Sequence, residues 1–501
     1  MQPLSGLDAA FLSLETRAVG LQVGAVLLLD PPAGARSGGV VGDRLAVLLR
    51  MIDRQLDLVP RFRQRVRRVP LDLAQPIWVD DEAFDLDHHV TRMDAPPAAE
   101  GGLESLVANL MSRPLDPTRP LWELTLVEGV PGGRAALVLK LHHAIVDGMG
   151  AVALAARLLG RGPAAGADEV GEPPGPDPRP WRPEPPPGPG AMLGYVGAGV
   201  LRRSRAGADV LRWGAGRLAH VGRHSLLSAQ PPLVAPRSSI NGTLSAGRAF
   251  AAISLDRARL DVVRAAFATT TNEVVLAVVG GALRRLLDAR GEQLERSLAA
   301  LVPASTRRPG DGPLGNRLSG FVVPLGTQGE DPAGRLAGVA RASRAAQARH
   351  RVTRGRLLED AAELVPGFVT RTVVRSGERL GLFDRLPLPF NLVVSSLPGP
   401  PGELWCAGAR VVAIHPIGPV AGGVGLNVTA MRYRGVLGVG LLGCRRLVPD
   451  IAGLGAGLEE ALDELVASAG AATARRAEPW DPGAPTGRCP TDVPCPLAGL
   501  V

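Results

Sequence analysis

The segment LVLKLHHAIVDGMG brings together residue types that can perform acid–base chemistry: His142 and His143 are adjacent, and Asp147 and Gly148 follow closely. Near pH 7 a neutral imidazole can accept the proton of a hydroxyl group while that hydroxyl attacks a carbonyl carbon. The segment therefore predicts a general-base site at which an alcohol is activated.

The two histidines are expected to have different roles, because side chains alternate along a strand. His143 shares a face with Leu139 and Leu141, whereas His142 shares the opposite face with Lys140. One histidine can then face a reaction channel as the base while its neighbour is held within the structure.

Asp147 and Gly148 favour a turn from this strand into a following helix. We expect Asp147 to fix the backbone of the turn and to pair with a buried arginine. His143 and Asp147 could ligate a metal ion on spacing alone, but no third ligand is evident, so no metal and no permanently bound cofactor are expected.

The dipeptide His88-His89 in FDLDHHV provides an internal control, since no Asp-Gly turn follows it. We interpret this second pair as structural.

The elements that must position these residues alternate between strand-like and helical patterns. Before residue 160, strand-like stretches at 21–30 and 135–146 are each followed by a helical stretch, at 43–56 and 148–160. The same interleaving continues after residue 248. It predicts an α/β fold and excludes a helical bundle or an all-β sandwich.

Composition limits the class of partner. The chain has 501 residues, a net charge of +8 and only one lysine, Lys140, so almost all of its basic residues are arginines. Aromatic residues make up only 3%, and no zinc-finger or basic-zipper pattern occurs, which argues against nucleic acid. Acidic lipid headgroups or a polyphosphorylated cofactor fit the arginine excess equally well.

Stretches rich in proline and glycine suggest the domain boundaries. We predict five regions: a first domain with the His-His motif (1–160), a Pro/Gly-rich linker (161–190), a basic amphipathic connector (191–235), a second domain (236–476) and a disordered tail (477–501).

Two segments bear on membrane contact. Between residues 191 and 230 the chain has six arginines and only one acidic residue, Asp209. This basic stretch is either an interfacial membrane helix or a solvated connector. The uncharged stretch 411–431 has the length of a membrane span, but its prolines and glycines favour two buried strands joined by a loop. The first 15 residues do not resemble a secretion signal.

The motif HHxxxDG, here His142 to Gly148, resembles the signature of the CoA-dependent acyltransferase superfamily, which includes chloramphenicol acetyltransferase and the condensation domains of nonribosomal peptide synthetases. Further blocks resemble bacterial wax ester synthase/acyl-CoA:diacylglycerol acyltransferases. In chain order they are LSGLDAAFLSLET (4–16), PLWELTLVEG (120–129), TNEVVLAVVGGALRRLL (271–287), LVPASTRRPGDGPLGNRLSGFVVPL (301–325), FNLVVSSLPGPP (390–401) and GPVAGGVGLNVTAMRYRG (418–435).

This resemblance implies two chloramphenicol-acetyltransferase-like domains with an active-site channel between them. His143 matches the general base of the family, and Asp147 matches its structural acid. Acyl-CoA is implied as a co-substrate.

The chain departs from the family pattern at three positions. Glu273 follows Asn272 where the family usually has Asn-Asp, and Ser396 follows Ser395 where the second residue is usually Asn. Gly438 stands where the family tends to have an acidic residue. These departures put the rate and the acceptor preference in doubt.

An acyl transfer needs donors for the oxyanion of its tetrahedral intermediate. Four polar residues are candidates, although each could equally be an ordinary turn or strand-end residue: Asn272, Asn391, Ser395 and Ser396. Glu15 and Trp122 could line the channel, or, for Trp122, form part of the core.

The sequence thus predicts an O-acyltransferase that moves a long acyl chain from acyl-CoA to diacylglycerol, and to long-chain alcohols, without an acyl-enzyme, since GxSxG is absent. The alternatives are acyl transfer to another alcohol or amine, and a catalytically weakened lipid-binding or scaffold homologue. Its insoluble acceptors suggest a cytoplasmic protein attached peripherally to a membrane or lipid-droplet surface.

Overall fold

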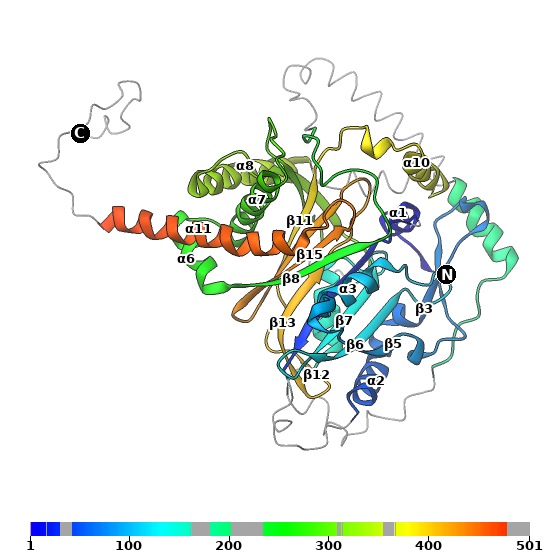
Figure 1. Ribbon diagram of the computed structural model, residues 1–501. Coiled ribbons are helices and arrows are strands. Elements are labelled where there is room, and N and C mark those ends of the chain that lie inside the picture. The colour runs from blue at the N-terminus through cyan, green and yellow to red at the C-terminus, as the bar shows by residue number, and fades with distance from the viewer. Residues whose placement is uncertain are drawn as a thin grey trace, which may run out of the picture.

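The computed structural model describes residues 2–16, 18–30, 43–160, 162, 181–201, 234–307, 312, 314–353, 365 and 367–477. The predicted α/β architecture is confirmed, with two six-stranded sheets (Figure 1). The predicted tail and the part of the basic segment from 202 to 230 lie outside the described residues.

The first sheet carries the His-His motif at the end of a central strand. Most neighbours are antiparallel, and only β5 and β6 run parallel. Its spatial order is β12 (Trp405–Cys406), β13 (Ala409–Ile417), β2 (Gln22–Leu29), β7 (Arg134–His142), β6 (Trp122–Val130) and β5 (Val90–Asp94). The helices of this half are α2 (Arg44–Gln55), α3 (Gly102–Ser112) and α4 (Gly148–Leu158).

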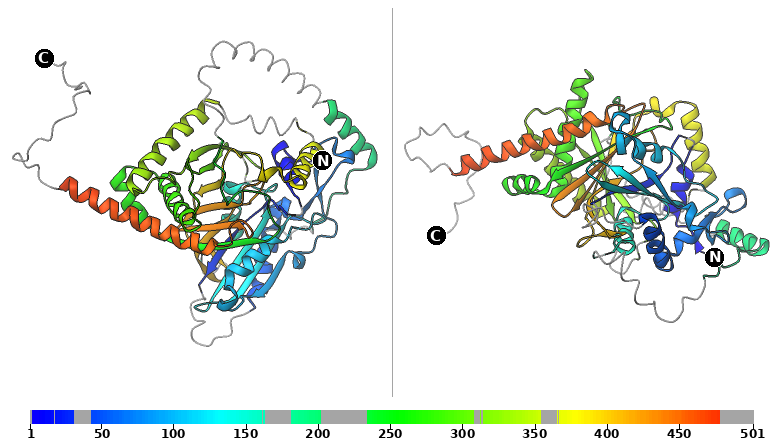
Figure 2. Two further views of the ribbon diagram at one scale, coloured as in Figure 1. Left: turned by 45° about the horizontal axis from the view of Figure 1, so that its top comes forward. Right: turned by 60° about the horizontal axis from the view of Figure 1, so that its bottom comes forward.

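The second sheet is covered on one side by helices, as two further views show (Figure 2). Its spatial order is β10 (Leu318–Pro324), β9 (Ala299–Ser305), β11 (Leu392–Leu397), β14 (Leu426–Tyr433), β15 (Val436–Cys444) and β8 (Arg248–Asp256). The helices are α6 (Arg257–Phe267), α7 (Thr271–Ala289), α8 (Pro332–Thr353) and α11 (Ile451–Ala477).

Smaller elements lie around the first sheet and at the junction of the two halves. A three-stranded sheet has the order β1 (Gln2–Pro3), β4 (Ile77–Asp80) and β3 (Gln64–Arg67). The remaining α-helices are α1 (Gly6–Leu14), a helix over Pro189–Leu201 and α10 (Gly367–Arg379). Short 3₁₀ turns are η2 (Leu56–Leu58), η3 (Pro60–Arg63), η4 (Pro70–Asp72), η5 (Leu86–His88), η6 (Ala98–Glu100) and η8 (Leu382–Asp384).

Strands β12 and β13 belong to the first sheet although they fall in the range predicted for the second domain, 236–476. β13 pairs with β2 in antiparallel register, with His415 opposite Val26. The sequence could not indicate that these strands cross to the other sheet, because a buried strand has the same apolar pattern in either sheet. The prediction of two strands and a loop within 411–431 agrees with β13 and β14.

The two sheets meet where β13 packs against β15, and glycine makes this approach possible. A Cβ atom at Gly438 would lie 2.0 Å from the carbonyl oxygen of Ile414, and one at Gly440 would lie equally close to that of Pro416. Gly438, one of the three departures from the family pattern, thus occupies a position without room for a side chain.

No single helix among the described residues is both long enough and apolar enough to cross a membrane. Helices α6 and α7 meet the length and composition criteria only as a pair, and they are bent by 103° relative to each other.

Candidate active site

A cavity of about 700 Å³ lies between the two sheets. Strands β2 and β7 and helix α4 form one side, strands β9, β10, β11 and β14 form the other, and α1 and β13 also contribute. Most lining side chains are apolar. The polar ones are His143, Ser305, Ser319, Thr370, Ser395, Ser396, Asn427 and Thr429.

His143 follows the last residue of β7 and lines this cavity. Its backbone amide donates to the carbonyl of Leu21, which extends the pairing with β2. Its ring stacks on Phe11 of α1, with centroids 4.3 Å apart. The imidazole is therefore held between the end of the strand and α1, and only 9% of the residue is exposed to solvent.

Asn316 fixes the tautomer of His143. Its side-chain nitrogen donates to Oδ1 of Asp8 at 2.6 Å and to the backbone oxygen of His143 at 2.5 Å, which leaves Oδ1 as the acceptor facing the ring. Nδ1 of His143 lies 2.8 Å from that oxygen and so carries the proton. Nε2 is then the basic nitrogen.

Burial lowers the pKa of His143, because the charged imidazolium loses its hydration in this apolar surrounding. The hydrogen bond to Asn316 and the charge of Asp147 oppose this effect only in part. The imidazole is accordingly neutral near pH 7, which is the form that a general base requires.

Asp147 is fully buried and performs the two structural roles predicted for it. Its Oδ1 accepts from the amide of Gly150 at 2.7 Å, which caps the N-terminus of α4. Its Oδ2 lies 2.9 Å from Nη2 of Arg307, an arginine partner that the sequence could not identify and whose side chain is 14% exposed rather than fully buried.

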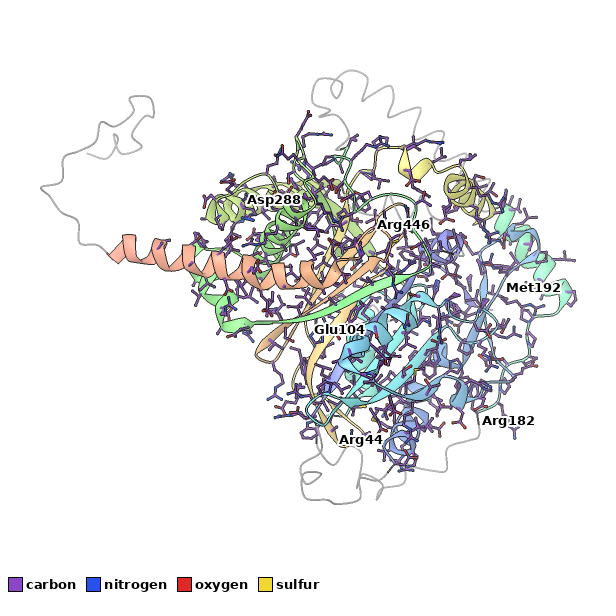
Figure 3. The ribbon with its side chains drawn as sticks, in the orientation of Figure 1. Arg44, Glu104, Arg182, Met192, Asp288 and Arg446 are labelled. Carbon is purple, nitrogen blue, oxygen red and sulfur yellow. The ribbon has the colours of Figure 1, made fainter. Side chains whose placement is uncertain are left out.

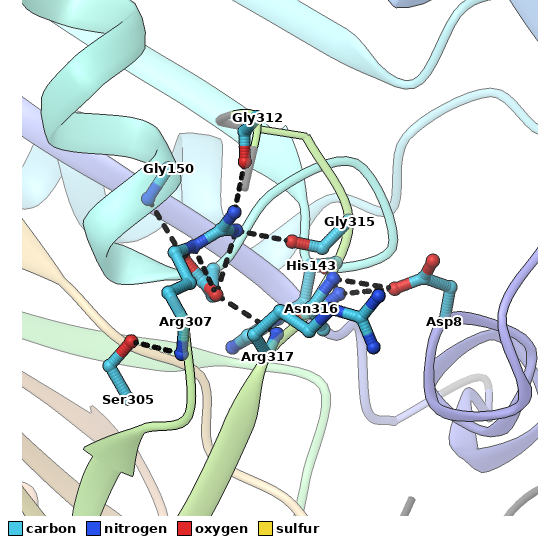
Figure 4. A network of polar contacts seen from close by, with 10 residues as sticks. Asp8, His143, Gly150, Ser305, Arg307, Gly312, Gly315, Asn316 and Arg317 are labelled. Atoms are coloured by element: carbon cyan, nitrogen blue, oxygen red, sulfur yellow. Dashed lines mark hydrogen bonds and ion pairs between the residues drawn. The ribbon is translucent and has the colours of Figure 1, made fainter. Parts of the chain in front are cut away.

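The Asp147 pair also positions the loop that carries Asn316 (Figure 4). Oδ2 of Asp147 accepts from the amide of Arg317 at 3.1 Å, and Arg307 donates to the carbonyl of Gly315 at 2.6 Å. The Gly315 amide in turn donates to the carbonyl of Ile145 within the motif. The loop that carries Asn316 is thus tied to Asp147, whose charge also favours a higher pKa of His143.

His142 points away from the cavity lining. Its Nδ1 accepts from the amide of Ala144, and Nε2 lies 3.0 Å from Oε1 of Glu15. Burial alone would raise the pKa of Glu15, but the contact with His142 and the amide of Leu21 outweigh it and lower that pKa. Glu15 thus contacts His142, the neighbour of His143, and is not among the cavity-lining residues.

Of the predicted oxyanion candidates, Ser395 and Ser396 on β11 line the cavity. The structure adds Asn427 and Thr429 on the adjacent strand β14, where Ser395 stands opposite Thr429. The Thr429 hydroxyl donates to Oδ1 of Asn427 at 2.7 Å. The facing half therefore presents a small polar group within an otherwise apolar wall.

The structure places the other candidates elsewhere. The Asn391 side chain accepts from the amide of Ala299 and donates to the carbonyl of Pro236, so it joins backbone segments. Asn272 lies in the first turn of α7, outside the cavity lining. Trp122 is core: its indole donates to the carbonyl of Phe62.

Glu273 forms a capping box with Thr270 at the start of α7, and its Oε1 lies 2.8 Å from Nε of Arg344. This departure from the family pattern therefore supports a helix terminus. Burial would raise the pKa of Glu273, but Arg344 and the cap lower it.

Around His143, sequence reasoning missed Asn316, Asp8 and Phe11, in addition to Arg307, Asn427 and Thr429. Asp8 and Phe11 lie on α1, and Asn316 lies between β9 and β10. Each falls within a block that resembles the family, and the polar pair Asn316-Arg317 between two apolar strands was the available signal.

Among the described residues, no group of three or more His, Cys, Asp or Glu side chains is arranged to hold a metal ion. The donors around His143 are amide and carboxylate groups already engaged with one another.

Two stacked sheets with a neutral histidine between them define the class to which this protein belongs: the CoA-dependent acyltransferase fold. A condensation domain of the calcium-dependent antibiotic synthetase shares this fold, with a TM-score of 0.53 at 17% identity over 93% of this chain and 96% of that one.

The chain belongs to the wax ester synthase/diacylglycerol acyltransferase family and is thus an acyltransferase, as the sequence predicted. Residues 4–275 match the catalytic domain of this family, and residues 314–466 match its C-terminal domain. The wax ester synthase/diacylglycerol acyltransferase of Marinobacter aquaeolei VT8 superposes with a TM-score of 0.66 at 28% identity, covering 94% of this chain and all of that one.

Two Mycobacterium tuberculosis proteins that are named as diacylglycerol O-acyltransferases match along most of their length. Rv1760 is 32% identical, over 93% of this chain and 90% of its own. Rv3480c is 33% identical, over 93% of this chain and 97% of its own.

Proposed function

We propose that the protein transfers a long acyl chain from acyl-CoA to the free hydroxyl of diacylglycerol, with Nε2 of His143 as the general base. The hydroxyl proton passes to Nε2 while the oxygen attacks the thioester carbonyl carbon. The tetrahedral intermediate then collapses, the carbon–sulfur bond breaks, and the imidazolium returns the proton to the CoA thiolate. The products are triacylglycerol and CoA, without an acyl-enzyme.

The observation that carries this proposal is the fixed tautomer of His143 at the wall of an apolar cavity. Asn316 holds the proton on Nδ1, and burial keeps the ring neutral. General-base assistance of this kind contributes roughly 10²–10⁴-fold in rate. Ser395 and Ser396, on β11 of the facing sheet, are our candidates for the donors that stabilise the oxyanion.

The shape and lining of the cavity support long apolar substrates. About 700 Å³ bounded by aliphatic side chains from both sheets accommodates hydrocarbon and contains few groups that would favour a polar acceptor. The same lining suits a long-chain alcohol, so we propose wax ester synthesis as a second activity, in keeping with the name of the Marinobacter relative.

The test is acyl transfer by the purified protein from radiolabelled palmitoyl-CoA, once to dioleoylglycerol and once to hexadecanol. Triacylglycerol and wax ester are the expected products, and both should disappear in His143→Ala. Absence of product with both acceptors from a folded native protein would favour a lipid-binding scaffold. We place the enzyme in the cytoplasm at a membrane or lipid-droplet surface, where its acceptors reside.

A further inference from the structure

Helix α10 exposes its apolar side chains to solvent. Val369 and Val373 lie about one turn apart on the same face of α10, and Leu380 directly follows the last residue of the helix. They are 36%, 64% and 60% exposed. Large aliphatic groups exposed along a surface helix and at its C-terminal end are unusual for a globular protein.

Two charged side chains of α10 make contacts with the protein. Glu378 accepts from the hydroxyl of Thr16 at 2.8 Å, and Nη2 of Arg371 lies 2.8 Å from Oδ2 of Asp72. Gly377 is buried, close to Phe383. A helix at a water-exposed surface usually turns its apolar stripe towards the core. The exposed apolar side chains therefore indicate that the outer face of α10 meets an apolar partner.

Further exposed apolar residues enlarge this face. We call the set the apolar rim: Val365, Phe368, Val369, Val373, Leu380 and Leu386, which are 36–64% exposed. The helix Pro189–Leu201 lies nearby and exposes Leu193 and Leu201. Met192 of this helix, labelled in Figure 3, packs against the loop that follows η4. Helix α10 packs against η4 itself, so the two helices contact neighbouring parts of the chain.

The charge around the rim favours an anionic surface. Residues 367–386 contain four arginines and two acidic residues, a net charge of +2. Both acids are engaged: Glu378 with Thr16, and Asp384 with the amide and hydroxyl of Thr243. Arg375 and Arg379 are exposed, and neither pairs with an acidic side chain of the described residues. Apolar groups flanked by free arginines are typical of interfacial helices on acidic lipid.

The rim adjoins the catalytic cavity. Val365 and Thr370 line that cavity, and Val365 is also 44% exposed, so the cavity reaches the surface at this point. Gly367 packs against Ser13 of α1, the helix whose Phe11 stacks on His143. A hydrophobic acceptor leaving a bilayer at the rim would thus reach the base without crossing water.

We propose that the apolar rim on α10 is the surface by which the protein docks onto anionic lipid, and that docking sets the mouth of the cavity against the bilayer. The aliphatic side chains enter the interface while Arg375 and Arg379 contact lipid phosphates. This assignment rests on the proposed function, because that function makes the cavity the destination of a membrane-borne acceptor.

The binding test compares the native protein with a double variant, Val373→Asn with Leu380→Asn, by co-sedimentation with vesicles. One set of vesicles is pure phosphatidylcholine and the other contains phosphatidylglycerol as well. Both substituted side chains are largely exposed, so the fold is retained. We expect loss of most of the bound fraction on the anionic vesicles.

The matched control is Val262→Asn with Leu58→Asn, because these aliphatic residues are 51% and 58% exposed but lie outside the rim. This control should bind like the native protein. A second variant, Arg375→Gln with Arg379→Gln, should bind anionic vesicles more weakly than the native protein. The binding that is left should depend less on the salt concentration. Unchanged vesicle binding by both rim variants would overturn the proposal.

An activity test separates this proposal from the proposed function. With dioleoylglycerol dispersed in detergent, the rim variants should match the native rate, whereas with dioleoylglycerol in anionic vesicles they should fall several-fold. A native protein without activity in either format refutes the proposed function instead. Sedimentation velocity tests whether a second copy of the chain covers the apolar rim instead of lipid. If the native protein is a dimer and the Val373/Leu380 variant is a monomer, while vesicle binding is unchanged, the proposal of a lipid-docking surface is refuted.

Discussion

The two His-His pairs of this chain differ in their surroundings, and this difference separates the histidine that we propose as the base from the one that we interpret as structural. His143 and His89 are both buried, and burial lowers the pKa of both. His89, however, is stacked between Phe84 and Trp122, and its Nδ1 donates to the carbonyl of Trp122. His143 instead borders a cavity, with its proton held on the far nitrogen by Asn316.

The comparison teaches that neither the dipeptide nor the direction of the pKa shift identifies a base. The informative features are an accessible ring nitrogen and a partner that fixes the tautomer. At His143, Asn316 fixes the tautomer, and Asp147 holds the loop that carries Asn316. At His89, two aromatic rings surround the imidazole instead.

The largest expected effect distinguishes the two pairs directly. His143→Ala should lower the rate of acyl transfer by about 10²–10⁴-fold, because the base is removed while the fold persists. Initial rates with labelled acyl-CoA measure the loss, and circular dichroism monitors the fold.

The matched substitution is His89→Ala, which should keep most of the turnover but lower the melting temperature, since it leaves a gap between two stacked rings. Equal losses of activity in the two variants, with both folded, would remove the distinction between the pairs.

The next largest effect concerns Asp147, which has no counterpart at the second pair. Asp147→Asn leaves Arg307 without its buried charge partner, and breaking such a pair costs about 3–5 kcal/mol. Chemical denaturation should show this loss of stability together with lower activity. A variant that is fully stable yet inactive would instead assign Asp147 a direct part in the chemistry.

A smaller effect is expected at Asn316, which we treat as a positioning residue. Asn316→Ala removes the acceptor for Nδ1 of His143, at a cost of about 1–3 kcal/mol, equivalent to roughly 5-fold to 150-fold in rate. The fall should appear in kcat more than in KM. Asn316→Gln serves as the conservative comparison, and a change confined to KM would argue against the positioning role.

The smallest effect is a difference in pH dependence. Because the pKa of His143 lies below its usual 6.5, kcat/KM should fall only at a pH below that value. His89→Gln should leave this midpoint unchanged. A midpoint that moves in His89→Gln would mean that the second pair also controls the rate.

Stability should respond to acid through both histidines. A buried histidine with a lowered pKa contributes stability that is complete above the pKa of the unfolded chain and is lost as the pH falls below it. We therefore expect the free energy of unfolding to decrease below about pH 6.5, and to decrease less steeply in His89→Gln.

Local parts of the site could be predicted from the sequence and distant parts could not. His142, His143 and Asp147 lie close together in the chain, so alternation along one strand predicted different roles for the two histidines, and the turn predicted a structural place for Asp147. The resemblance to the family implied that His143 is the base. Asn316 reaches His143 only through the packing of two sheets, and no pattern near residue 143 indicates it.

The polar residues Asn391 and Asn272 illustrate the opposite limit. Both lie in blocks that resemble the family, yet the amide of Asn391 joins the backbone segments at Ala299 and Pro236, and Asn272 belongs to the first turn of a helix. A polar residue in a block that resembles the family can equally serve the backbone or the substrate, and only the direction of its side chain decides between them. The exchange of β12 and β13 was unpredictable for a similar reason.

That exchange has a consequence for the synthesis of the protein. Val411 of β13 pairs with Leu29 of β2, so one edge of the first sheet stays open on the ribosome until nearly the whole chain has emerged. An unpaired apolar edge is a template for aggregation, and contacts between such distant residues form slowly. We therefore expect the nascent N-terminal half to bind a chaperone until β13 emerges. If the two halves were produced as separate polypeptides, they would have to assemble before the first sheet was complete.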